Sequence, residues 1–278
     1  MPHEIAIAAG AEIGAVLMDS PLDAVDTRIL VMHALGLSRT QLITQDRRAL
    51  TADEALRLTA LLRRRLQGEP IAYITGEREF YGLPFSVTPA VLIPRPETEL
   101  LVDLALERLP PQGAALDMGT GSGAIPVALA HTRPDAAVTA LDVSAAALEV
   151  ARGNAVRHRA GVEFLQSDWY AALGDRRFDL IVSNPPYIVA GDAHLSQGDL
   201  RFEPVDALTD HGDGLSALRT IIAGAPRHLA PGSWLLLEHG YDQAPAVRAL
   251  LTANGFLDVQ SWRDLAGIER ASGGRHSA

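Results

Sequence analysis

From residue 114 onward, short apolar segments alternate with helical segments, and this alternation restricts the fold more than any other feature of the sequence. Such an order of strands and helices produces a mostly parallel sheet with helices on both faces. Two segments near the C-terminus are expected to close the sheet as antiparallel strands. The predicted strands cover residues 114–116, 138–141, 162–166, 178–182, 233–238, 257–262 and 268–271. The sequence therefore predicts an α/β domain with a seven-stranded sheet, followed by a disordered tail over 272–278.

The N-terminal quarter of the chain has apolar residues at helical spacing. Thr51 and Glu54 form a capping-box pattern ahead of a leucine-rich helix. Ser20 is predicted to cap an earlier helix with proline at its first position, and Gly36 to end it. A short hairpin follows, and then a stiff, proline-rich linker. We predict three domains: a helical bundle over 1–75, a β-hairpin and linker over 76–95, and the α/β domain over 96–278.

A glycine-rich turn follows the first predicted strand. Its G-x-G-x-G spacing, preceded by an acid, differs from the G-x-G-x-x-G of dinucleotide-binding enzymes. Glycines let the backbone approach a ligand closely. An acid at this place suits a cofactor that carries an ammonium group rather than a pyrophosphate. The expected cofactor-binding residues of this turn are Asp117, Gly119, Thr120, Gly121, Ser122 and Gly123.

The next two strands also end in side chains that suit a nucleoside. Asp142 lies 19 residues beyond Gly123, where an acid holds ribose hydroxyls in nucleotide-binding folds. Asp168 and Trp169 follow the third strand, where a hydrogen bond and a stacked ring would bracket an adenine. The structural alternative for Asp142 is a role as a helix cap, although Ser144 could supply that cap instead. The structural alternative for Trp169 is a position in the core. Because parallel strands end at one edge of the sheet, we expect a ligand site at this edge.

The fourth strand ends in the stretch Asn184-Pro185-Pro186-Tyr187. The prolines lack N–H groups and hold the chain extended, so the neighbouring carbonyls stay outside the sheet. An amide oxygen and such carbonyls can accept both hydrogens of a planar NH2 group, and the tyrosine ring offers a face for stacking. The structural alternative is a strand ended by proline and followed by a core tyrosine. We predict that Asn184, Pro185, Pro186 and Tyr187 are catalytic and that Asn184 also contacts the cofactor.

Together these features describe S-adenosylmethionine as the cofactor, with S-adenosylhomocysteine as its product. An amide or exocyclic nitrogen is a poor nucleophile because its lone pair is delocalised. Acceptors at Asn184 Oδ1 and the Pro185 carbonyl would hold both N–H bonds and aim the lone pair at the methyl group. No strong base is required, since the methylated nitrogen becomes acidic. The sequence therefore predicts methyl transfer to an NH2 nitrogen.

The composition of the chain limits the cellular location and the kinds of binding partner that we expect. The net charge of −10 argues against broad attraction to a nucleic-acid backbone, so no direct nucleic-acid binding is expected. The absence of cysteine excludes disulfides and thiolate metal ligands, fits a reducing cytoplasm, and no metal site is expected. No apolar run approaches the roughly 18 residues of a membrane span. Residues 1–4 lack the basic start of a secretory signal. We expect a cytoplasmic, monomeric protein without a membrane partner.

With these residues in view, the chain resembles the HemK/PrmC-type family, the release factor glutamine methyltransferases, nearly from end to end. The most specific part of the resemblance is the stretch Pro94-Arg95-Pro96-Glu97-Thr98-Glu99 taken together with Asn184 to Tyr187. Further matching stretches are 68–70, 73–76, 80–82, 117–123, 201–204 and 264–267, with Arg270. No motif position departs from the family pattern.

The resemblance implies a class I, Rossmann-like S-adenosylmethionine-dependent methyltransferase. Its substrates would be class I peptide chain release factors, methylated on the side-chain nitrogen N5 of the glutamine in their Gly-Gly-Gln motif. It also implies that 119–123, Asp142 and Trp169 contact the cofactor, that 184–187 hold the glutamine, and that the helical domain docks the release factor. For Glu97 and Glu203 two roles stay open, lining the cleft or forming structural ion pairs.

Three alternatives remain at this point. A sister enzyme would apply the same chemistry to a glutamine of a ribosomal protein. An adenine-N6 DNA methyltransferase would present a different NH2 group to the same motif, although the net charge and the lack of a basic recognition domain argue against it. A binding module that retains only the nucleotide fold is disfavoured by the intact Asp117, Asp142 and Asn184.

Overall fold

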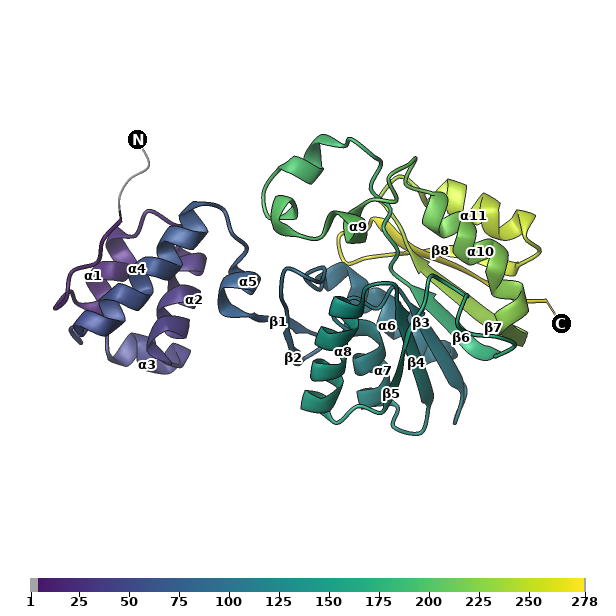
Figure 1. Ribbon diagram of the computed structural model, residues 1–278, viewed down its shortest axis with the longest axis horizontal. Coiled ribbons are helices and arrows are strands. Elements are labelled where there is room, and N and C mark those ends of the chain that lie inside the picture. The colour runs from purple at the N-terminus through teal and green to yellow at the C-terminus, as the bar shows by residue number, and fades with distance from the viewer. Residues whose placement is uncertain (1–4, 278) are drawn as a thin grey trace. The chain divides into compact units, whose positions relative to one another are not determined.

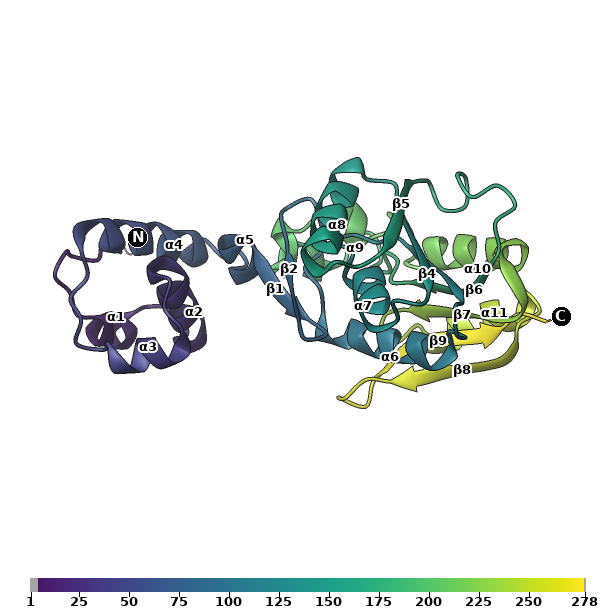
Figure 2. The same ribbon diagram turned by 90° about the horizontal axis from the view of Figure 1, so that it is seen from below.

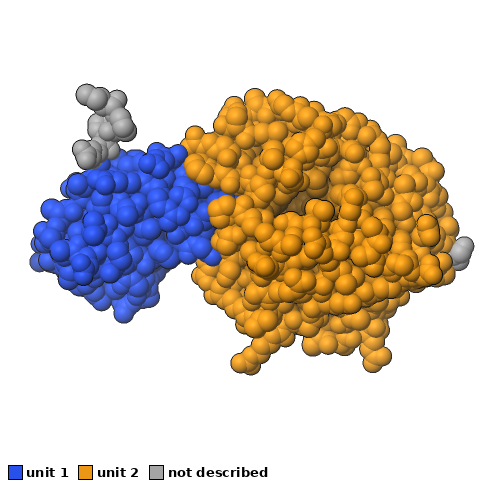
Figure 3. Space-filling model, viewed as in Figure 1, with its two compact units in different colours: residues 1–76 blue, residues 77–278 orange. Residues whose placement is uncertain are grey.

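The computed structural model describes residues 5–277, which divide into two compact units (Figure 3): unit 1, up to Gly76, and unit 2, from Glu77. The prediction made from residues 1–4 lies outside the described residues, as does the last residue of the predicted tail. None of the helices in the described part of the chain combines the length and the apolar character needed to cross a membrane.

Unit 1 is a bundle of helices whose ends follow local sequence signals. The predicted capping box is confirmed, because the Thr51 and Glu54 side chains each accept from the other's backbone N–H. Gly36 ends its helix in the left-handed conformation, as predicted. The prediction for Ser20 is wrong: the helix begins at Ala24, because the Asp23 side chain accepts from the backbone of the first turn. The helices are α1 (Ile13–Asp19), α2 (Ala24–Leu35), α3 (Arg39–Thr44), α4 (Ala52–Leu66) and α5 (Ile71–Thr75).

Unit 2 begins with a hairpin of β1 (Glu77–Phe80) and β2 (Leu83–Ser86). Tyr81 and Gly82 between them both have positive φ, as a tight two-residue hairpin turn requires. Phe80 and Phe85 are buried and meet edge to face, with ring centroids 6.0 Å apart, inside the core of unit 2. The hairpin therefore packs against the core of unit 2.

The predicted seven-stranded sheet is confirmed, in the order β5-β4-β3-β6-β7-β9-β8. The first five strands of that order are parallel, and β9 is antiparallel to both of its neighbours. The strands are β3 (Ala114–Met118), β4 (Ala137–Asp142), β5 (Val162–Gln166), β6 (Phe178–Ser183), β7 (Leu229–Glu238), β8 (Leu257–Arg263) and β9 (Glu269–Arg275).

The predicted disorder after residue 271 is wrong for Ser272 to Arg275, which complete β9 between β7 and β8. Pairing on both sides satisfies the backbone of this segment. Gly273 also fits the position through its lack of a side chain, because a Cβ there would lie 2.5 Å from the Leu235 carbonyl oxygen. A segment that is polar and glycine-rich in sequence is therefore an interior strand.

Helices cover both faces of the sheet (Figures 1 and 2). The chain passes from β3 through β4 to β5 and then returns to β6 beside β3, so the order reverses between β3 and β6. Open α/β sheets bind ligands at the carboxyl ends of the strands at such a reversal. One face carries α6 (Glu99–Arg108), α7 (Ala124–Thr132) and α8 (Ala145–His158), and the other carries α10 (Ser216–His228) and α11 (Ala244–Ala253).

Candidate active site

A cavity of about 270 Å³ opens at the carboxyl edge of the parallel strands of unit 2. Figure 3 shows that the surface of unit 2 is hollowed. The strand ends that the sequence singled out meet here. Of the predicted site residues, the structure places Gly119, Gly121, Asp142, Asp168, Trp169, Asn184 and Pro186 on the cavity wall.

Asp117 lies behind this wall, at the end of β3. Its side chain is 1% exposed, and neither carboxylate oxygen accepts a hydrogen bond within the described part of the chain. Burial raises the pKa of Asp117 to about 7, although the nearby Thr120 hydroxyl opposes the shift. A buried carboxyl group with two unused oxygens suits a cationic ligand group brought to it from outside.

The glycine-rich turn is tied to its neighbours through its backbone. The N–H groups of Gly119 and Thr120 both donate to the Leu141 carbonyl at 2.9 Å, which fixes the turn against the end of β4. Ser122 is buried, and its carbonyl accepts from Asn154 Nδ2 at 2.8 Å. Thr120, Ser122 and Gly123 are thus supports behind the wall. Sequence reasoning missed Asn154, a buried polar side chain in the middle of a helix.

Asp142 connects the turn to the following helix. Its two oxygens accept from the backbone N–H groups of Gly121 and Ser144, each at 2.9 Å. The cap of α8 is the Ser144 side chain, which accepts from the Ala147 N–H. The cap is therefore supplied by Ser144, and Asp142 faces the cavity with remaining acceptor capacity.

Asp168 and Trp169 follow β5 on the same wall. Asp168 is exposed, and Trp169 is half-buried against the core on the α10 side. Trp169 has φ +44°, a left-handed conformation that is strained for a bulky residue. The Ser167 hydroxyl donates to the Trp169 carbonyl at 2.7 Å and holds this conformation. Strain of this kind concentrates at ligand sites, and Trp169 lies on the cavity wall.

Asn184 is oriented by a residue far away in sequence. Its Nδ2 donates to Thr98 Oγ1 at 3.2 Å, and Thr98 belongs to the 3-10 helix Pro96–Thr98 that precedes α6. No described residue donates to Asn184 Oδ1, which therefore remains an available acceptor at the cavity. Thr98, within the stretch Pro94 to Glu99 singled out by the resemblance, thus positions the amide of Asn184.

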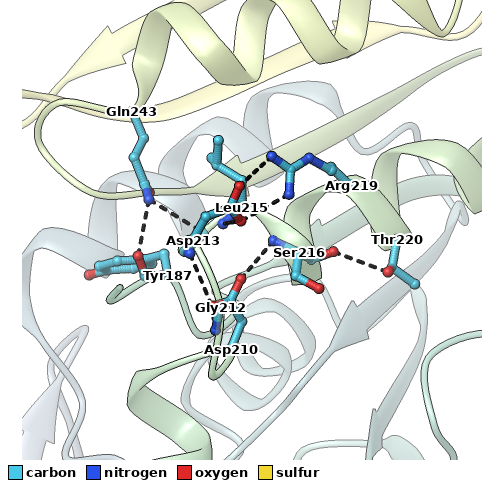
Figure 4. Close-up of polar contacts among 10 residues, drawn as sticks. Tyr187, Asp210, Gly212, Asp213, Leu215, Ser216, Arg219, Thr220 and Gln243 are labelled. Atoms are coloured by element: carbon cyan, nitrogen blue, oxygen red, sulfur yellow. Dashed lines mark hydrogen bonds and ion pairs between the residues drawn. The ribbon is translucent and has the colours of Figure 1, made fainter. Parts of the chain in front are cut away.

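Gln243 fixes the other end of the Asn-Pro-Pro-Tyr stretch (Figure 4). Its Nε2 donates to the carbonyls of Tyr187 and Gly214, at 3.0 and 3.1 Å. Gly214 has φ +75°, and a Cβ there would lie 2.5 Å from the Tyr187 oxygen. Asp210 closes the same turn by accepting from three backbone N–H groups, among them that of Gly214. Sequence reasoning missed this clamp because its parts are separated along the chain.

Two segments outside the sheet complete the cavity wall, residues 90–92 and 204–207. Glu203 connects the chain beside these two segments. Its buried side chain accepts from the Ile93 N–H at 3.0 Å and forms an ion pair with Arg95. Glu203 thus has the structural role, whereas Glu97 is exposed. The segment 188–212 contains α9 (Val205–Leu208) and contributes one side of the cavity.

Glu238, at the end of β7, is a further buried carboxyl group that sequence reasoning left without a role. It is 2% exposed, its Oε1 accepts from the Tyr187 hydroxyl at 3.3 Å, and its Oε2 has no partner among the described residues. Burial raises the pKa of Glu238 to about 7. Sequence reasoning missed Glu238 because, in the sequence, it is only the polar residue that ends an apolar strand.

Family models match two parts of the chain. Residues 96–202 match the methyltransferase small domain, and residues 11–76 match the PrmC N-terminal domain. A crystal structure of a methyltransferase from Pyrococcus furiosus has the same fold, with a TM-score of 0.55, 22% identity, and coverage of 78% of this chain and 98% of that one. Its sheet order and its cavity at the strand reversal give the chain the class I, Rossmann-like fold of methyltransferases.

The relatives define the family more narrowly. The release factor glutamine methyltransferase of Burkholderia pseudomallei is 60% identical, with 95% of this chain and 96% of the relative covered. That of Neisseria gonorrhoeae is 52% identical, with 92% and 95% covered. The chain belongs to the family of the release factor glutamine methyltransferases, which confirms the resemblance carried by its motifs.

Proposed function

We propose that this protein transfers a methyl group from S-adenosylmethionine to the side-chain nitrogen N5 of the glutamine in the Gly-Gly-Gln motif of class I peptide chain release factors. The observation that carries the proposal is the free Asn184 Oδ1 at a cavity whose other walls suit a nucleoside. The names of the relatives support the same acceptor. Methylated glutamine and S-adenosylhomocysteine are the products.

The residues around the cavity fit S-adenosylmethionine. The orphaned carboxylate of Asp117 suits its ammonium group, and the half-buried Trp169 ring suits stacking on its adenine. Asp142 retains acceptor capacity that suits ribose hydroxyls, and the exposed Asp168 on the same wall suits the adenine amino group. When bound, the cofactor supplies an electrophilic methyl group on a sulfonium sulfur.

The chain's own contribution to the reaction is positioning. Asn184 Oδ1 and the Pro185 carbonyl accept the two N–H bonds of the substrate amide, which raises electron density on nitrogen and directs its lone pair. Pro185 and Pro186 hold these acceptors rigidly, and the Tyr187 ring packs against the substrate side chain. After transfer, the methylated nitrogen is acidic and gives its proton to water.

We further propose that the helical domain, residues 1–75, recognises the release factor, that residues 76–95 connect it to the catalytic domain, and that residues 96–278 carry out methyl transfer. The family match of residues 11–76 supports a distinct role for the helical domain. The release factor is the proposed macromolecular partner, and we propose that the protein acts as a monomer in the cytoplasm, without a nucleic-acid partner.

The test uses methyl-labelled S-adenosylmethionine with a purified release factor and with the same factor carrying alanine in place of the Gly-Gly-Gln glutamine. We expect label on the first and none on the second. Label on both, or on neither while the cofactor still binds, would overturn the proposed acceptor. The same assay with ribosomal proteins identifies the substrate in that event.

A further inference from the structure

Asn154 is a fully buried polar side chain of α8 to which the proposed mechanism gives no role. It is 0% exposed, and its amide makes three hydrogen bonds, all of them to backbone groups. Its Nδ2 donates to the Ser122 carbonyl at 2.8 Å and to the Ser86 carbonyl at 3.0 Å, and its Oδ1 accepts from the Ser86 N–H at 2.8 Å. One amide therefore binds two segments that are far apart in the sequence.

The partners of Asn154 determine the orientation of its amide. A carbonyl can only accept a hydrogen bond and a backbone N–H can only donate one. The NH2 group must therefore face the two carbonyls, and the amide oxygen must face the Ser86 N–H. A carboxylate or an apolar side chain of similar size could not satisfy all three backbone groups, and a buried group left without a partner is costly. The position therefore requires a side-chain amide.

The first partner of Asn154, Ser122, belongs to the glycine-rich turn, which reaches the cavity wall at Gly121. Helix α8 approaches this turn at a second point, because a Cβ on Gly123 would lie only 3.0 Å from the Ala151 Cβ. Gly123 has φ +80°, so glycine fits the position both by its backbone conformation and by the space available. Helix α8 thus lies directly behind the turn, and Asn154 is the side chain that hydrogen-bonds to it.

The second partner of Asn154, Ser86, ends β2, and the chain after it leads to residues 90–92 on another part of the cavity wall. Helix α8 lies beside β2 (Figures 1 and 2). His158, one turn further along α8, lies with its Nε2 2.8 Å from the Pro84 carbonyl oxygen of the same strand. No hydrogen bond within the described part of the chain joins the His158 side chain to the glycine-rich turn, whereas Asn154 binds both the turn and β2.

We propose that Asn154 is a positioning residue of the cofactor site. Its amide fixes the glycine-rich turn relative to the end of β2, so that the turn and residues 90–92 form two walls of one cavity. Asn154 is buried behind the wall and acts through the backbones of Ser122 and Ser86. The inference rests on the proposed function in one respect, the choice of S-adenosylmethionine as the ligand of the cavity.

Asn154→Ala removes all three hydrogen bonds and tests the proposal. We expect it to weaken binding of S-adenosylmethionine by roughly 10- to 100-fold in titration calorimetry, because small displacements of binding groups have effects of this order. In the protein without cofactor, the backbone N–H groups of residues 119–123 should exchange with solvent roughly tenfold faster or more. The KM for S-adenosylmethionine should rise while kcat stays nearly unchanged, since the loss affects binding and not the reacting groups.

His158→Ala is the matched control. It removes a side chain of the same helix that contacts the same strand, through the Pro84 carbonyl and the Phe85 ring, but not the glycine-rich turn. It should leave the cofactor affinity and the hydrogen exchange of residues 119–123 unchanged. Urea unfolding of both variants measures their stability, so that a general loss of stability is distinguished from a displaced turn.

A measurement on the wild type decides the matter if Asn154→Ala does not fold. The Ser86 N–H donates to Asn154 and does not lie on the cavity wall. Bound S-adenosylmethionine should slow its hydrogen exchange more than that of the Ala114 N–H, which donates to Asp179 at the start of β3. Stabilisation of the whole fold by a ligand slows both exchange rates alike, so the additional slowing at Ser86 reports the connection through Asn154.

Three results would overturn this inference alone: wild-type cofactor affinity in Asn154→Ala, an equal loss of affinity in His158→Ala, or equal slowing of exchange at Ser86 and Ala114. A wild-type protein that binds the cofactor but leaves the release factor unlabelled would overturn the proposed acceptor and not this inference. A wild-type protein that binds no S-adenosylmethionine would overturn both. The failures are therefore distinguishable.

Discussion

Three carboxyl groups of unit 1 form ion pairs, whereas two carboxyl groups at the cavity edge of unit 2 are buried with oxygens that lack a partner among the described residues. Asp26, Glu54 and Glu69 each pair with an arginine of unit 1, at 2.5–3.0 Å. Asp117 and Glu238 are almost fully buried, and each has at least one oxygen without a partner. The Thr51 backbone N–H and then Arg48 lower the pKa of Glu54, and Arg64 lowers that of Glu69, whereas burial raises the pKa of Asp117 and Glu238 to about 7.

The difference distinguishes carboxyl groups that contribute to stability from carboxyl groups that serve a function. An ion pair at the surface of a helical bundle contributes little and costs little. A buried carboxyl group without a partner destabilises the folded chain, and such groups concentrate where a ligand or a reaction uses them. The sheet edge therefore carries groups that the fold alone would not need, and four changes test this contrast.

The largest effect is expected for Asn184→Ala. It removes the acceptor for one N–H bond of the substrate, and the loss of one preorganised group of this kind lowers kcat by roughly 100- to 1,000-fold. Rates of methyl transfer at saturating substrates measure it. The free energy of unfolding should change little, because Asn184 is half-buried and only its bond to Thr98 is lost. A kcat within threefold of the wild type would contradict the proposed role.

Asp117→Asn should weaken binding of S-adenosylmethionine by roughly 10- to 100-fold at pH 8, the size of a lost charge-assisted hydrogen bond. Titration calorimetry at pH 6 and pH 8 measures the effect. Because the pKa of Asp117 is raised to about 7, the wild type should bind more weakly at pH 6 than at pH 8, and the variant should not show this difference. Asp179→Asn is the control, since Asp179 accepts from the Ala114 backbone at the start of the sheet. Equal pH dependence in the wild type and Asp117→Asn would exclude the ammonium contact.

Without cofactor, the same carboxyl group gives stability the opposite dependence on pH. Its pKa is higher in the folded chain than the ordinary 3.8, so its contribution is fully present below about pH 4 and is lost as the pH rises through 7. Asp117→Asn removes that loss. Urea unfolding should therefore show the variant gaining stability relative to the wild type between pH 5 and pH 8; a constant difference would contradict the raised pKa.

Gly214→Ala tests the clamp on Tyr187. The added Cβ would lie 2.5 Å from the Tyr187 oxygen and 2.9 Å from Gln243 Nε2, at a residue with φ +75°. We expect a loss of about 1–3 kcal/mol in the free energy of unfolding and a clear fall in kcat, because the Asn-Pro-Pro-Tyr stretch is displaced. Gly10→Ala, also at positive φ but with open space around it, is the control and should lose stability without losing kcat.

The smallest effect is expected for Glu69→Gln in unit 1. The pair of Glu69 with Arg64 is partly exposed, and such pairs contribute about 0.2–1 kcal/mol. Its pKa is lowered by Arg64, so the stabilisation is present above the ordinary value of 4.5 and is lost as the pH falls below it. Urea unfolding at pH 7 and pH 4 measures this. A loss of unfolding free energy larger than that caused by Gly214→Ala would contradict the contrast between the two regions.

The sequence by itself determined the strands and helices, the glycine-rich turn and the Asn-Pro-Pro-Tyr stretch, because spacing, capping residues and prolines act within a few neighbouring residues. The same locality explains two errors. Ser20 and Asp23 both suit a helix cap, and only the folded turn selects Asp23. The polar segment 272–275 becomes a strand only when β7 and β8 pair with it on both sides.

Only the tertiary structure decided which polar groups act together. Thr98 and Asn184 are 86 residues apart in sequence, and Ile93 and Glu203 are 110 apart, yet each pair forms a hydrogen bond. Whether a carboxyl group is buried with an oxygen that has no partner, as Glu238 is, depends on which distant elements pack around it. The burial and the orientation of polar side chains at a site arise from those long-range contacts, which the periodicity of the sequence does not predict.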